Sequence, residues 1–414
     1  MSRGARGLAW RVDAQVCLAL LASLAAIVYV SALLRHSSNW PFADDYHATL
    51  LFLIDWQSLS SWADRLALLF RPHNEHRLVF NHLVELTDVA LFGQVHFDHM
   101  VLVGNLCWAL ALGLLLRAGR RAGLAWQEMS PAVLLACTLS HHDLMVWAMG
   151  SLQQYGQILF CLLAAWAASR DRFAWSLVAA SAAAGAGGGG FAVFPALAVC
   201  WASRRQWARA GLTLLLMAVW LFLHTRHLPA AAQGAGRLAG LLSHPLEALG
   251  YMTCFLGSVG KSTQASIALG ALQLGCLGWL LLREDAMRKQ PFFSMVALWL
   301  LTSAMLAALA RFDLGIGQAR STRYTPHAIT LLMATGLLAI SLANTAAQRS
   351  MRWRCWAALA TILWATWLLH GWKQQSRHHE AVTSGQRTGL PSPHEAHRVL
   401  EAARSRGVFV PPAP

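Results

Sequence analysis

Apolar runs of roughly 18–20 residues recur along the whole chain, and they restrict the fold more than any other feature. A run of this length crosses the hydrocarbon core of a bilayer, about 30 Å thick, as a single helix. Only 13% of the 414 residues are charged, whereas 56% are hydrophobic. Soluble domains carry about 25% charged residues. The sequence therefore predicts an all-α polytopic membrane protein.

The basic residues gather in short clusters between the apolar runs. The net charge of +14 could indicate a nucleic-acid partner, but short basic loops are typical of the cytoplasmic side of membrane proteins. We therefore expect membrane lipids and no nucleic acid as partners. The clusters are RGARGLAWR (3–11), RAGRR (117–121), RDR (170–172), RRQWAR (204–209), REDAMRK (283–289) and QRSMRWR (348–354).

This charge pattern predicts a topology of about 11 spans with a cytoplasmic N-terminus and a C-terminus outside the cytoplasm. The first run is longer than a signal-peptide core and lacks a clear cleavage site, so we expect it to be retained. A transmembrane domain would cover 1–372, and a short outer tail would cover 373–414. The expected spans are 12–34, 99–116, 129–141, 150–168, 173–187, 191–203, 210–225, 264–282, 291–310, 325–344 and 355–372. The glycine-rich stretch 182–191 could form a re-entrant turn between two of them.

Histidine and acidic residues favour the outer side of this topology. All 18 histidines fall in expected outer loops, at outer span ends or in the tail. We therefore expect any chemistry on the outer face. His142, in SHHDLMVW (140–147), is one candidate contact for a substrate there.

The first outer loop, 35–98, is the largest and contains two helical patterns, 48–70 and 75–93. In the second pattern, polar residues recur at helical spacing with apolar residues largely on the other side. Neither pattern is apolar enough to span comfortably, so we expect two helices lying on the membrane surface. The polar stripe consists of Arg77, Asn81, Glu85 and Asp88.

Asp44 and Asp45, in NWPFADDYHATL (39–50), stand just outside the first span. A carboxylate pair near a bilayer is costly unless it is paired, hydrated or bound to a cation. Adjacent side chains diverge by about 100° at the start of a helix, so one could face a substrate while the other holds a partner. The simpler alternative is that one of them caps the helix that follows Pro41.

The segment RPHNEHRLVFNH (71–82) adds a second group of polar side chains to the same loop. Arg77 can hold phosphate or carboxylate oxygens through two parallel hydrogen bonds. Two alternatives stay open: the polar side chains could be the wet face of a surface helix, or the histidines could bind a metal. The candidate substrate contacts are His73, Asn74, Glu75 and His76.

The segment ARFDLGIGQARSTRYTPH (310–327) carries three arginines at the outer ends of two expected spans. Arginines that keep a loop in the cytoplasm lie on the other side of the membrane, so these three need another role. The guanidinium group has several N–H donors in one plane, which match the oxygens of a phosphate group. The alternative is that the arginines reach up to lipid headgroups without specificity. The candidate phosphate-binding residues are Arg311, Arg320, Arg323 and Tyr324, with Arg77 from the first loop.

The eight cysteines form no CxxC pair and lie in or beside apolar runs. They indicate neither a disulfide framework nor a thiolate zinc site. We expect them to be packing residues, and we assign no metal ligands from the sequence.

These features together resemble the GT-C superfamily of bacterial membrane glycosyltransferases, which include protein O-mannosyltransferases and arabinofuranosyltransferases. DDYH (44–47) looks like the acidic DE-x-H signature of the O-mannosyltransferases, with Asp44 at the catalytic position, Asp45 in place of glutamate, and His47 matching the histidine. HNEHR and ARFDLGIGQARSTRYT also look like segments of bacterial GT-C-like proteins. The likeness covers 1–120 and 305–330 and is only topological elsewhere.

The resemblance implies a donor, an acceptor and a location. The donor would be a polyprenyl-phosphate sugar, and the acceptor would be a hydroxyl of a glycan, a lipid or a protein such as a pilin, at the periplasmic face of the inner membrane. Asp44 would be the general base. Asp45 would position the acceptor or a divalent cation, Mg²⁺ or Mn²⁺, shared with Asp44. The arginines would stabilise the leaving phosphate.

Two other functions fit the same general pattern. O-antigen polymerases and ligases also have about a dozen spans and outer arginines, but they tend to place their key residues in a later loop. A lipid or solute transporter would place charges and broken helices near the middle of the membrane. Here the polar groups gather on one face, which favours the glycosyltransferase.

Overall fold

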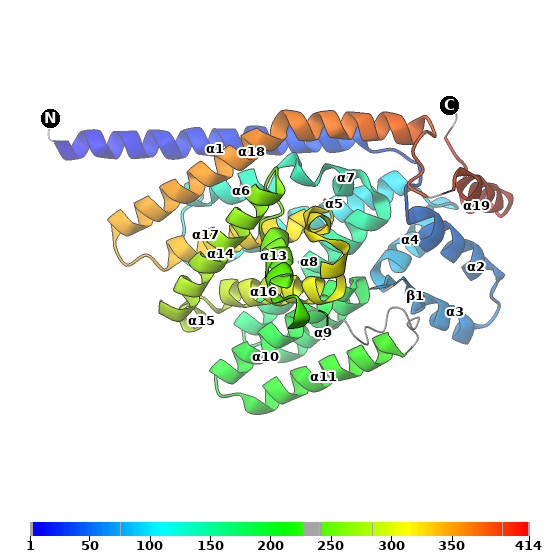
Figure 1. Cartoon of the computed structure of the whole chain (residues 1–414), viewed down its shortest axis with the longest axis horizontal. Coiled ribbons are helices and arrows are strands. Elements are labelled where there is room, and N and C mark those ends of the chain that lie inside the picture. Colours follow the sequence, from blue (N-terminus) through cyan, green and yellow to red (C-terminus); the bar gives the residue numbers. More distant parts are fainter. Residues whose placement is uncertain are drawn as a thin grey trace.

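The structure is a computed structural model that describes residues 3–74, 76–226, 240, 242–283, 285–390 and 392–412. Figure 1 shows a helical molecule in which two long helices, α1 (Arg3–His36) and α18 (Ala346–Thr383), lie along one side. The bundle beneath them contains α5 (Phe97–Arg121), α8 (Ala148–Ser169), α16 (Pro291–Arg311) and α17 (Thr325–Ser341). α9 (Phe173–Ala186), α10 (Val193–Ser203) and α11 (Trp207–Thr225) form the opposite side.

Five helices in the described part of the chain are long and apolar enough to cross a membrane. They are Ala14–His36, Phe97–Arg121, Trp207–Thr225, Thr263–Leu282 and Pro291–Leu314. Three shorter apolar helices, Phe173–Ala186, Gly188–Ser203 and Thr325–Ser341, add to them. An all-α, membrane-embedded architecture is therefore supported, whereas the expected count of about 11 spans is not confirmed.

One expected span is not a continuous helix. Over 129–141 the chain forms η2 (Gln127–Met129), the seven-residue α6 (Ser130–Ala136) and the 3-10 turn η3 (Leu139–His141), followed by α7 (His142–Val146). Gly371 of α18 explains how the chain packs here, because a Cβ at Gly371 would lie 2.4 Å from the carbonyl oxygen of Leu139. The segment 129–141 is therefore held in place by its close contact with α18.

The region expected as one outer loop, 226–263, also contains a helix, α13 (Pro245–Leu256), which packs against α14 (Thr263–Arg283). Gly257 and Gly270 allow this contact, since a Cβ on Gly270 would come within 1.8 Å of the carbonyl oxygen of Thr253. A short helix, α15 (Ala286–Lys289), links α14 to α16.

The glycine-rich stretch forms a tight, buried turn between α9 and α10, as the sequence suggested. α9 ends at Ala186, and the 3-10 turn η4 (Gly188–Ala192) leads directly into α10. A Cβ on Gly190 would lie 2.0 Å from the carbonyl oxygen of Ala183, so only glycine fits this turn.

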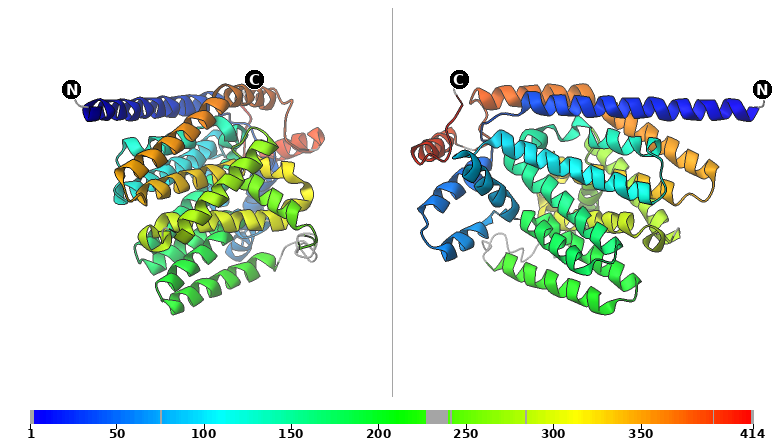
Figure 2. Two further views of the ribbon diagram at one scale, coloured as in Figure 1. Left: turned by 60° about the vertical axis from the view of Figure 1, so that its left-hand side comes forward. Right: turned by 180° about the vertical axis from the view of Figure 1, so that it is seen from behind.

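The first loop folds differently from the two surface helices that were expected. The π-helix η1 (Asp45–Leu51) continues into α2 (Phe52–Ser58), and α3 (Trp62–Leu69) follows after a break. A hairpin of β1 (Pro72–His73) and β2 (His76–Arg77) then precedes α4 (Val79–Phe92). Figure 2 shows these elements together at one end of the molecule.

Helix α4 also turns its polar stripe the opposite way from the expectation. Asn81, Glu85 and Asp88 are buried, and Arg77 before the helix is buried as well. Leu83 and Leu91 on the other side are 50% and 71% exposed. The stripe therefore points into the protein, and the apolar side is left facing outward, as a membrane-facing surface requires.

The C-terminal region is not a free polar tail. α18 continues through Trp372 to Thr383, so the helix itself does not end at residue 372. α19 (Pro393–Ser405) packs on η1, and Phe409 lies against Phe97 with ring centroids 5.2 Å apart. The last segment is therefore part of the same end of the molecule as the first loop.

The basic connections lie together at the other end of the bundle. Arg121 stacks on Trp166, Arg204 donates to the carbonyl oxygen of Ala168, and Arg349 pairs with Glu128. These contacts join the ends of α5, α8, α10 and the start of α18, which lie away from the first loop (Figure 1). The molecule thus has one end with basic connections and one end that carries the first loop.

Candidate functional site

A cavity of about 70 Å³ brings together side chains from four separate parts of the chain. The first loop contributes Asp44 and the hairpin, α8 contributes its first two turns, and the segment 311–323 contributes two arginines. These are the three segments that the sequence singled out for chemistry, together with the start of α8. The lining residues are Asp44, His73, Asn74, His76, Trp147, Met149, Gly150, Gln153, Gln154, Arg311 and Arg323.

Asp44 is the only carboxylate among these lining residues. Its backbone carbonyl accepts the N–H groups of His47 and Ala48 at the start of η1, but its side chain makes no capping hydrogen bond. The helix-cap alternative therefore does not account for Asp44. The carboxylate is 36% exposed and stays available to whatever enters the cavity.

Two basic groups surround the Asp44 carboxylate. His73 Nε2 lies 3.8 Å from Asp44 Oδ1, and Arg323 lines the same cavity. Interaction with His73, supported by Arg323 and His47, outweighs partial burial and lowers the pKa of Asp44 from its usual value. Asp44 is therefore an ionised acceptor at neutral pH.

Asp45 points the other way, into the protein. Its side chain is 1% exposed, and its two oxygens accept the N–H groups of Phe42 at 2.9 Å and Met149 at 2.8 Å. Burial raises the pKa of Asp45 to about 7, and the two backbone donors oppose that change. The expected sharing of a divalent cation between the two aspartates is thus not favoured by the geometry, because both oxygens of Asp45 are already engaged.

A buried polar layer lies behind the cavity, on the Asp45 side. Thr49 donates a hydrogen bond of 2.8 Å to Glu85, and Asn81 donates one of 2.9 Å to the carbonyl oxygen of Met149. Burial raises the pKa of Glu85 well above its usual value and so favours the protonated form, while the hydrogen bond from Thr49 opposes this change. We call Asp45, Thr49, Asn81 and Glu85 the buried polar layer. It fixes η1 and α4 against the start of α8.

The arginines come from the segment between α16 and α17. Arg311 donates a hydrogen bond of 2.7 Å to the hydroxyl of Tyr324, and Arg323 lies over the ring of the same tyrosine at 5.8 Å. Tyr324 does not line the cavity itself, but it holds both guanidinium groups at one rim. Two adjacent guanidinium groups opposite one carboxylate make a site for an anionic ligand.

The hairpin places a neutral histidine beside these charges. Burial, with a contribution from Arg323, lowers the pKa of His76 to about 4. His76 Nδ1 accepts the N–H of Gly188 in the glycine-rich turn at 3.3 Å, so the ring proton lies on Nε2. Asn74 adopts a positive φ of 50° at the tip of the hairpin, a conformation that asparagine tolerates.

Besides Asp45 and Tyr324, four sequence candidates lie outside the lining of the cavity. Arg320 donates to the carbonyl oxygen of Lys261 at 2.6 Å, and Arg77 donates to the carbonyl oxygens of Phe70 and Leu223. His47 pairs with Glu395 of α19 at 3.1 Å. His142 pairs with Asp143 at 3.0 Å, next to α18.

One further candidate, Glu75, lies outside the residues that the structure describes.

Sequence reasoning missed the contribution of the C-terminal segment. Ala43, directly before Asp44, has a positive φ of 51°, which is unfavourable for alanine. Its N–H donates to the carbonyl oxygen of Thr388 at 2.7 Å, and a Cβ on Gly389 would lie 2.8 Å from the Cα of Ala43. The C-terminal segment at Thr388 and Gly389 thus stabilises the backbone turn at Ala43, which determines the orientation of Asp44. No short-range sequence signal reports this contact.

Gln153 and Gln154, near the start of α8, also line the cavity. Gln154 donates to the side-chain oxygen of Gln153 at 3.3 Å. The Nε2 atom of Gln153 is buried and makes no hydrogen bond within the described residues. It is a donor that a ligand in the cavity could satisfy.

A second, larger cavity of about 1040 Å³ adjoins the first, because Asn74 lines both. It lies between the first loop and α11, whose candidate span is 11% buried. Its lining combines apolar residues such as Leu59 and Trp220 with charged ones such as Asp64 and Arg71. It is large enough for an amphiphilic molecule, whereas the cavity at Asp44 accepts only a small group without side-chain movement.

Comparisons of this chain with protein-family models, with curated proteins and with solved structures found no match.

Proposed function

We propose that this protein is a membrane glycosyltransferase of the GT-C type, which transfers a sugar from a polyprenyl-phosphate donor to a hydroxyl acceptor. The observation that carries the proposal is the shared cavity of Asp44, Arg311 and Arg323. An ionised carboxylate that faces two guanidinium groups suits a reaction in which a hydroxyl loses a proton and a phosphate leaves. The acceptor is a glycan, a lipid or a protein such as a pilin.

Asp44 is the proposed general base. The acceptor hydroxyl gives its proton to the Asp44 carboxylate while its oxygen bonds to the anomeric carbon of the sugar. The lowered pKa keeps Asp44 ionised before each turnover. The bond between the anomeric carbon and the phosphate oxygen breaks in the same step. A single displacement of this kind inverts the anomeric configuration.

Arg311 and Arg323 are the proposed phosphate ligands. Charge develops on the phosphate oxygen as the sugar departs, and fixed cations in a site with little water stabilise that charge strongly. Tyr324 orients both arginines, and His76 lines the same cavity as a neutral ring. Gln153 is a candidate contact for the sugar hydroxyls, since its amide nitrogen is buried without a partner in the described structure.

The larger cavity beside α11 is the proposed route for the lipid-linked substrate. The outer surface of α11 is rich in exposed apolar residues, and the cavity reaches the hairpin at Asn74. A polyprenyl chain could lie along that surface while its phosphate reaches Arg323. Donor binding then requires the residues around the small cavity to move apart, because its volume is below the about 300–1,000 Å³ of most ligand pockets.

The proposed location is the bacterial inner membrane, with the site on the periplasmic side. The basic connections between α5 and α6, α8 and α9, and α10 and α11 lie at the end opposite the first loop, as cytoplasmic loops do. The N-terminus is then cytoplasmic and the C-terminal segment periplasmic.

The test is a transfer assay with purified protein in detergent. Wild type, Asp44→Asn and the control Asp313→Asn receive a panel of radiolabelled polyprenyl-phosphate sugars and a cell-envelope extract. Asp313 is exposed and does not line the cavity. We expect transfer by wild type and by the control, and donor binding without transfer by Asp44→Asn.

Two outcomes would overturn parts of this proposal. Equal transfer by wild type and Asp44→Asn would remove Asp44 from the chemistry. Absence of donor binding by the wild type would reject the polyprenyl-phosphate donor and favour a polymerase, a ligase or a transporter.

A further inference from the structure

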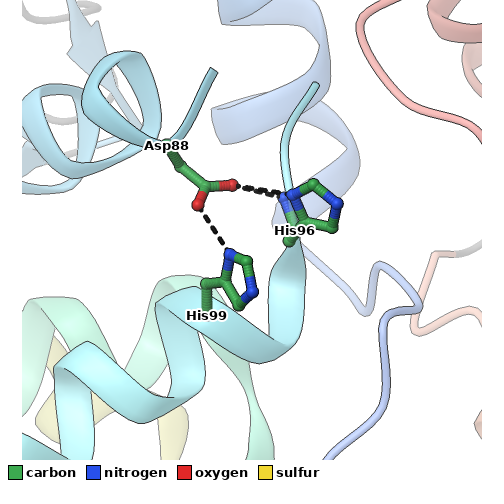
Figure 3. A group of neighbouring side chains, drawn as sticks. All are labelled: Asp88, His96 and His99. Atoms are coloured by element: carbon green, nitrogen blue, oxygen red, sulfur yellow. Dashed lines mark hydrogen bonds and ion pairs between the residues drawn. The ribbon is translucent and has the colours of Figure 1, made fainter. Parts of the chain in front are cut away.

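A separate cluster of polar side chains lies at the corner between α4 and α5, outside the lining of both cavities. Asp88 comes from the last turns of α4, His96 stands directly before α5, and His99 is in the first turn of α5 (Figure 3). Figure 3 shows both imidazole rings on the side of the Asp88 carboxylate. One ligand atom from each residue lies within 4.8 Å of the other two.

The local chain geometry explains why these residues meet. Gly93 ends α4 with a positive φ of 81°, which turns the chain sharply before α5 begins. His96 and His99 are three residues apart at a helix start, so their side chains share one face. Their ring centroids are 4.6 Å apart, and Phe92 packs on both rings.

The carboxylate is the most buried member of the cluster. Asp88 is 6% exposed, His96 21% and His99 36%. Asp88 Oδ2 accepts the backbone N–H of His96 at 2.6 Å and lies 3.3 Å from His96 Nδ1, while Asp88 Oδ1 lies 2.8 Å from His99 Nδ1. Two imidazole nitrogens therefore converge on a single carboxylate.

We propose that Asp88, His96 and His99 bind a divalent transition-metal ion of the Zn²⁺ class. Two imidazole nitrogens and one carboxylate oxygen form a ligand set that Zn²⁺ accepts, whereas Mg²⁺ and Ca²⁺ prefer oxygen ligands alone. With bonds of 2.0–2.2 Å, neighbouring ligand atoms of a tetrahedral site are about 3.3 Å apart. His96 Nδ1 lies 3.3 Å from Asp88 Oδ2, and His99 Nδ1 lies 2.8 Å from Asp88 Oδ1. A small rotation of the carboxylate is therefore needed to present one oxygen to an ion that both rings also bind.

The open side of the cluster fits the remaining coordination position. Three protein ligands leave one position for water or another small ligand. His99 is the most exposed of the three, so a small ligand can reach the cluster from the side of His99. Asp88 also keeps its backbone hydrogen bond to His96, which orients the carboxylate as a supporting hydrogen bond does in metal sites.

Metal binding here would stabilise the docking of the C-terminal segment. The N–H of Val95, next to His96, donates to the carbonyl oxygen of Val408 at 3.0 Å. An ion bound by Asp88, His96 and His99 would link α4 to the start of α5. It would thereby stabilise the backbone at Val95, which binds Val408 of the C-terminal segment. The inference does not depend on the proposed transferase activity, because its test measures metal binding and stability only.

The test uses the full chain in detergent, without a polyhistidine tag, after treatment with a chelator and desalting. Zn²⁺ is titrated in competition with a chromophoric chelator into wild type and His99→Gln. The control variant is His397→Gln, which removes an exposed histidine that pairs with Glu401 at 3.1 Å but has no third ligand among the described residues. We expect one tight site in wild type and in the control, and at least about 100-fold weaker binding in His99→Gln.

A Co²⁺ absorption spectrum and thermal unfolding give two further readouts. Co²⁺ bound to wild type should give the intense visible bands of a four- or five-coordinate ion, and Zn²⁺ should raise the Tm of wild type but not of His99→Gln. Because His99 is partly exposed, its variant should fold, and the Tm without metal checks this. Equal Zn²⁺ binding by wild type and His99→Gln, or only the weak spectrum of octahedral aqueous Co²⁺, would overturn the proposal.

Discussion

Asp44 and Asp45 are neighbours in the chain, but their carboxylates lie in regions with opposite properties. Asp44 faces a cavity with two arginines and two histidines, and its side chain makes no capping hydrogen bond. Asp45 is enclosed in the buried polar layer, where two backbone N–H groups and the neighbouring Glu85 surround it. The π-helix that starts at Asp45 separates the two side chains onto different faces. Two adjacent aspartates can therefore have different roles: one carboxylate is available to a ligand, and the other stabilises the fold.

The largest expected effect separates two arginines of one short segment. Arg323→Gln removes a guanidinium from the cavity, whereas Arg320→Gln removes one that binds the carbonyl oxygen of Lys261 outside it. We expect Arg323→Gln to lower kcat/KM for sugar transfer about 100- to 1,000-fold, as loss of a charge-stabilising donor does. Arg320→Gln should change it by less than about threefold, because Arg320 does not line the cavity. Steady-state transfer rates measure both, and equal losses would show that the cavity is not the site.

The second effect concerns stability instead of activity. Asp45→Ala leaves the N–H groups of Phe42 and Met149 buried without an acceptor, which should lower the free energy of unfolding by about 2–3 kcal/mol. Asp44→Ala removes a half-buried side chain with no capping role and should stay within about 0.5 kcal/mol. Thermal unfolding in detergent compares the two variants. If Asp44→Ala were the less stable variant, the division of roles between the two aspartates would be reversed.

The sequence predicted the components of the site better than their arrangement. Asp44, His73, His76, Arg311 and Arg323 were recognisable because charged groups stand out at the ends of apolar runs, where burial is costly unless the groups have a purpose. All five line one cavity. The residue types and their positions beside apolar runs therefore predicted which side chains meet in the cavity.

The orientation of α4 could not be read from its pattern. An amphipathic helix on a membrane protein can meet water with its polar side, or meet lipid with its apolar side and bury its polar stripe. Glu85 is fully buried and Leu91 is 71% exposed, so the second arrangement holds here. The spacing of residues is identical in both cases, and only the neighbouring α8 and η1 decide between them.

The contribution of the C-terminal segment was equally hidden, because it depends on contacts between residues more than 340 positions apart. Ala43 binds Thr388, and His47 binds Glu395. Short polar segments carry no periodic signal that predicts where they dock.

A third prediction tests whether this segment aims Asp44. A Cβ added at Gly389 would press on the backbone of Ala43, and the positive φ of 78° at Gly389 disfavours any other residue. We expect Gly389→Ala to displace Asp44 and to lower kcat about tenfold, since a shift of about 1 Å at a catalytic group can cost up to about 100-fold. Gly385→Ala is the matched control, because Gly385 also has a positive φ but no neighbour near an added Cβ. Equal losses of activity in both variants would indicate backbone strain alone.

The last prediction concerns the pH dependence that Asp45 gives to the free energy of unfolding. The folded protein keeps Asp45 protonated up to about pH 7, whereas the unfolded chain loses this proton near pH 3.9. The folded state thus binds more protons between these values, and stability falls as pH rises, by about 1.4 kcal/mol per pH unit from this group. His76 and His82, whose pKa values burial lowers to about 4, act in the opposite direction because stability is lost as pH falls below about 6.5.

The Asp45 contribution therefore has to be measured as a difference between variants. Asp45→Asn keeps the size of the side chain and removes its titration, while Glu85 and the histidines remain. We expect the Tm of Asp45→Asn to rise relative to wild type as pH increases from about 4 to 7, and the difference to be constant above that range. Asp44→Asn should show the opposite trend and only at low pH, because the pKa of Asp44 is lowered and its stabilising effect is present above the unfolded value. A Tm difference for Asp45→Asn that does not vary with pH would mean that Asp45 is ionised in the fold, held by its two backbone donors.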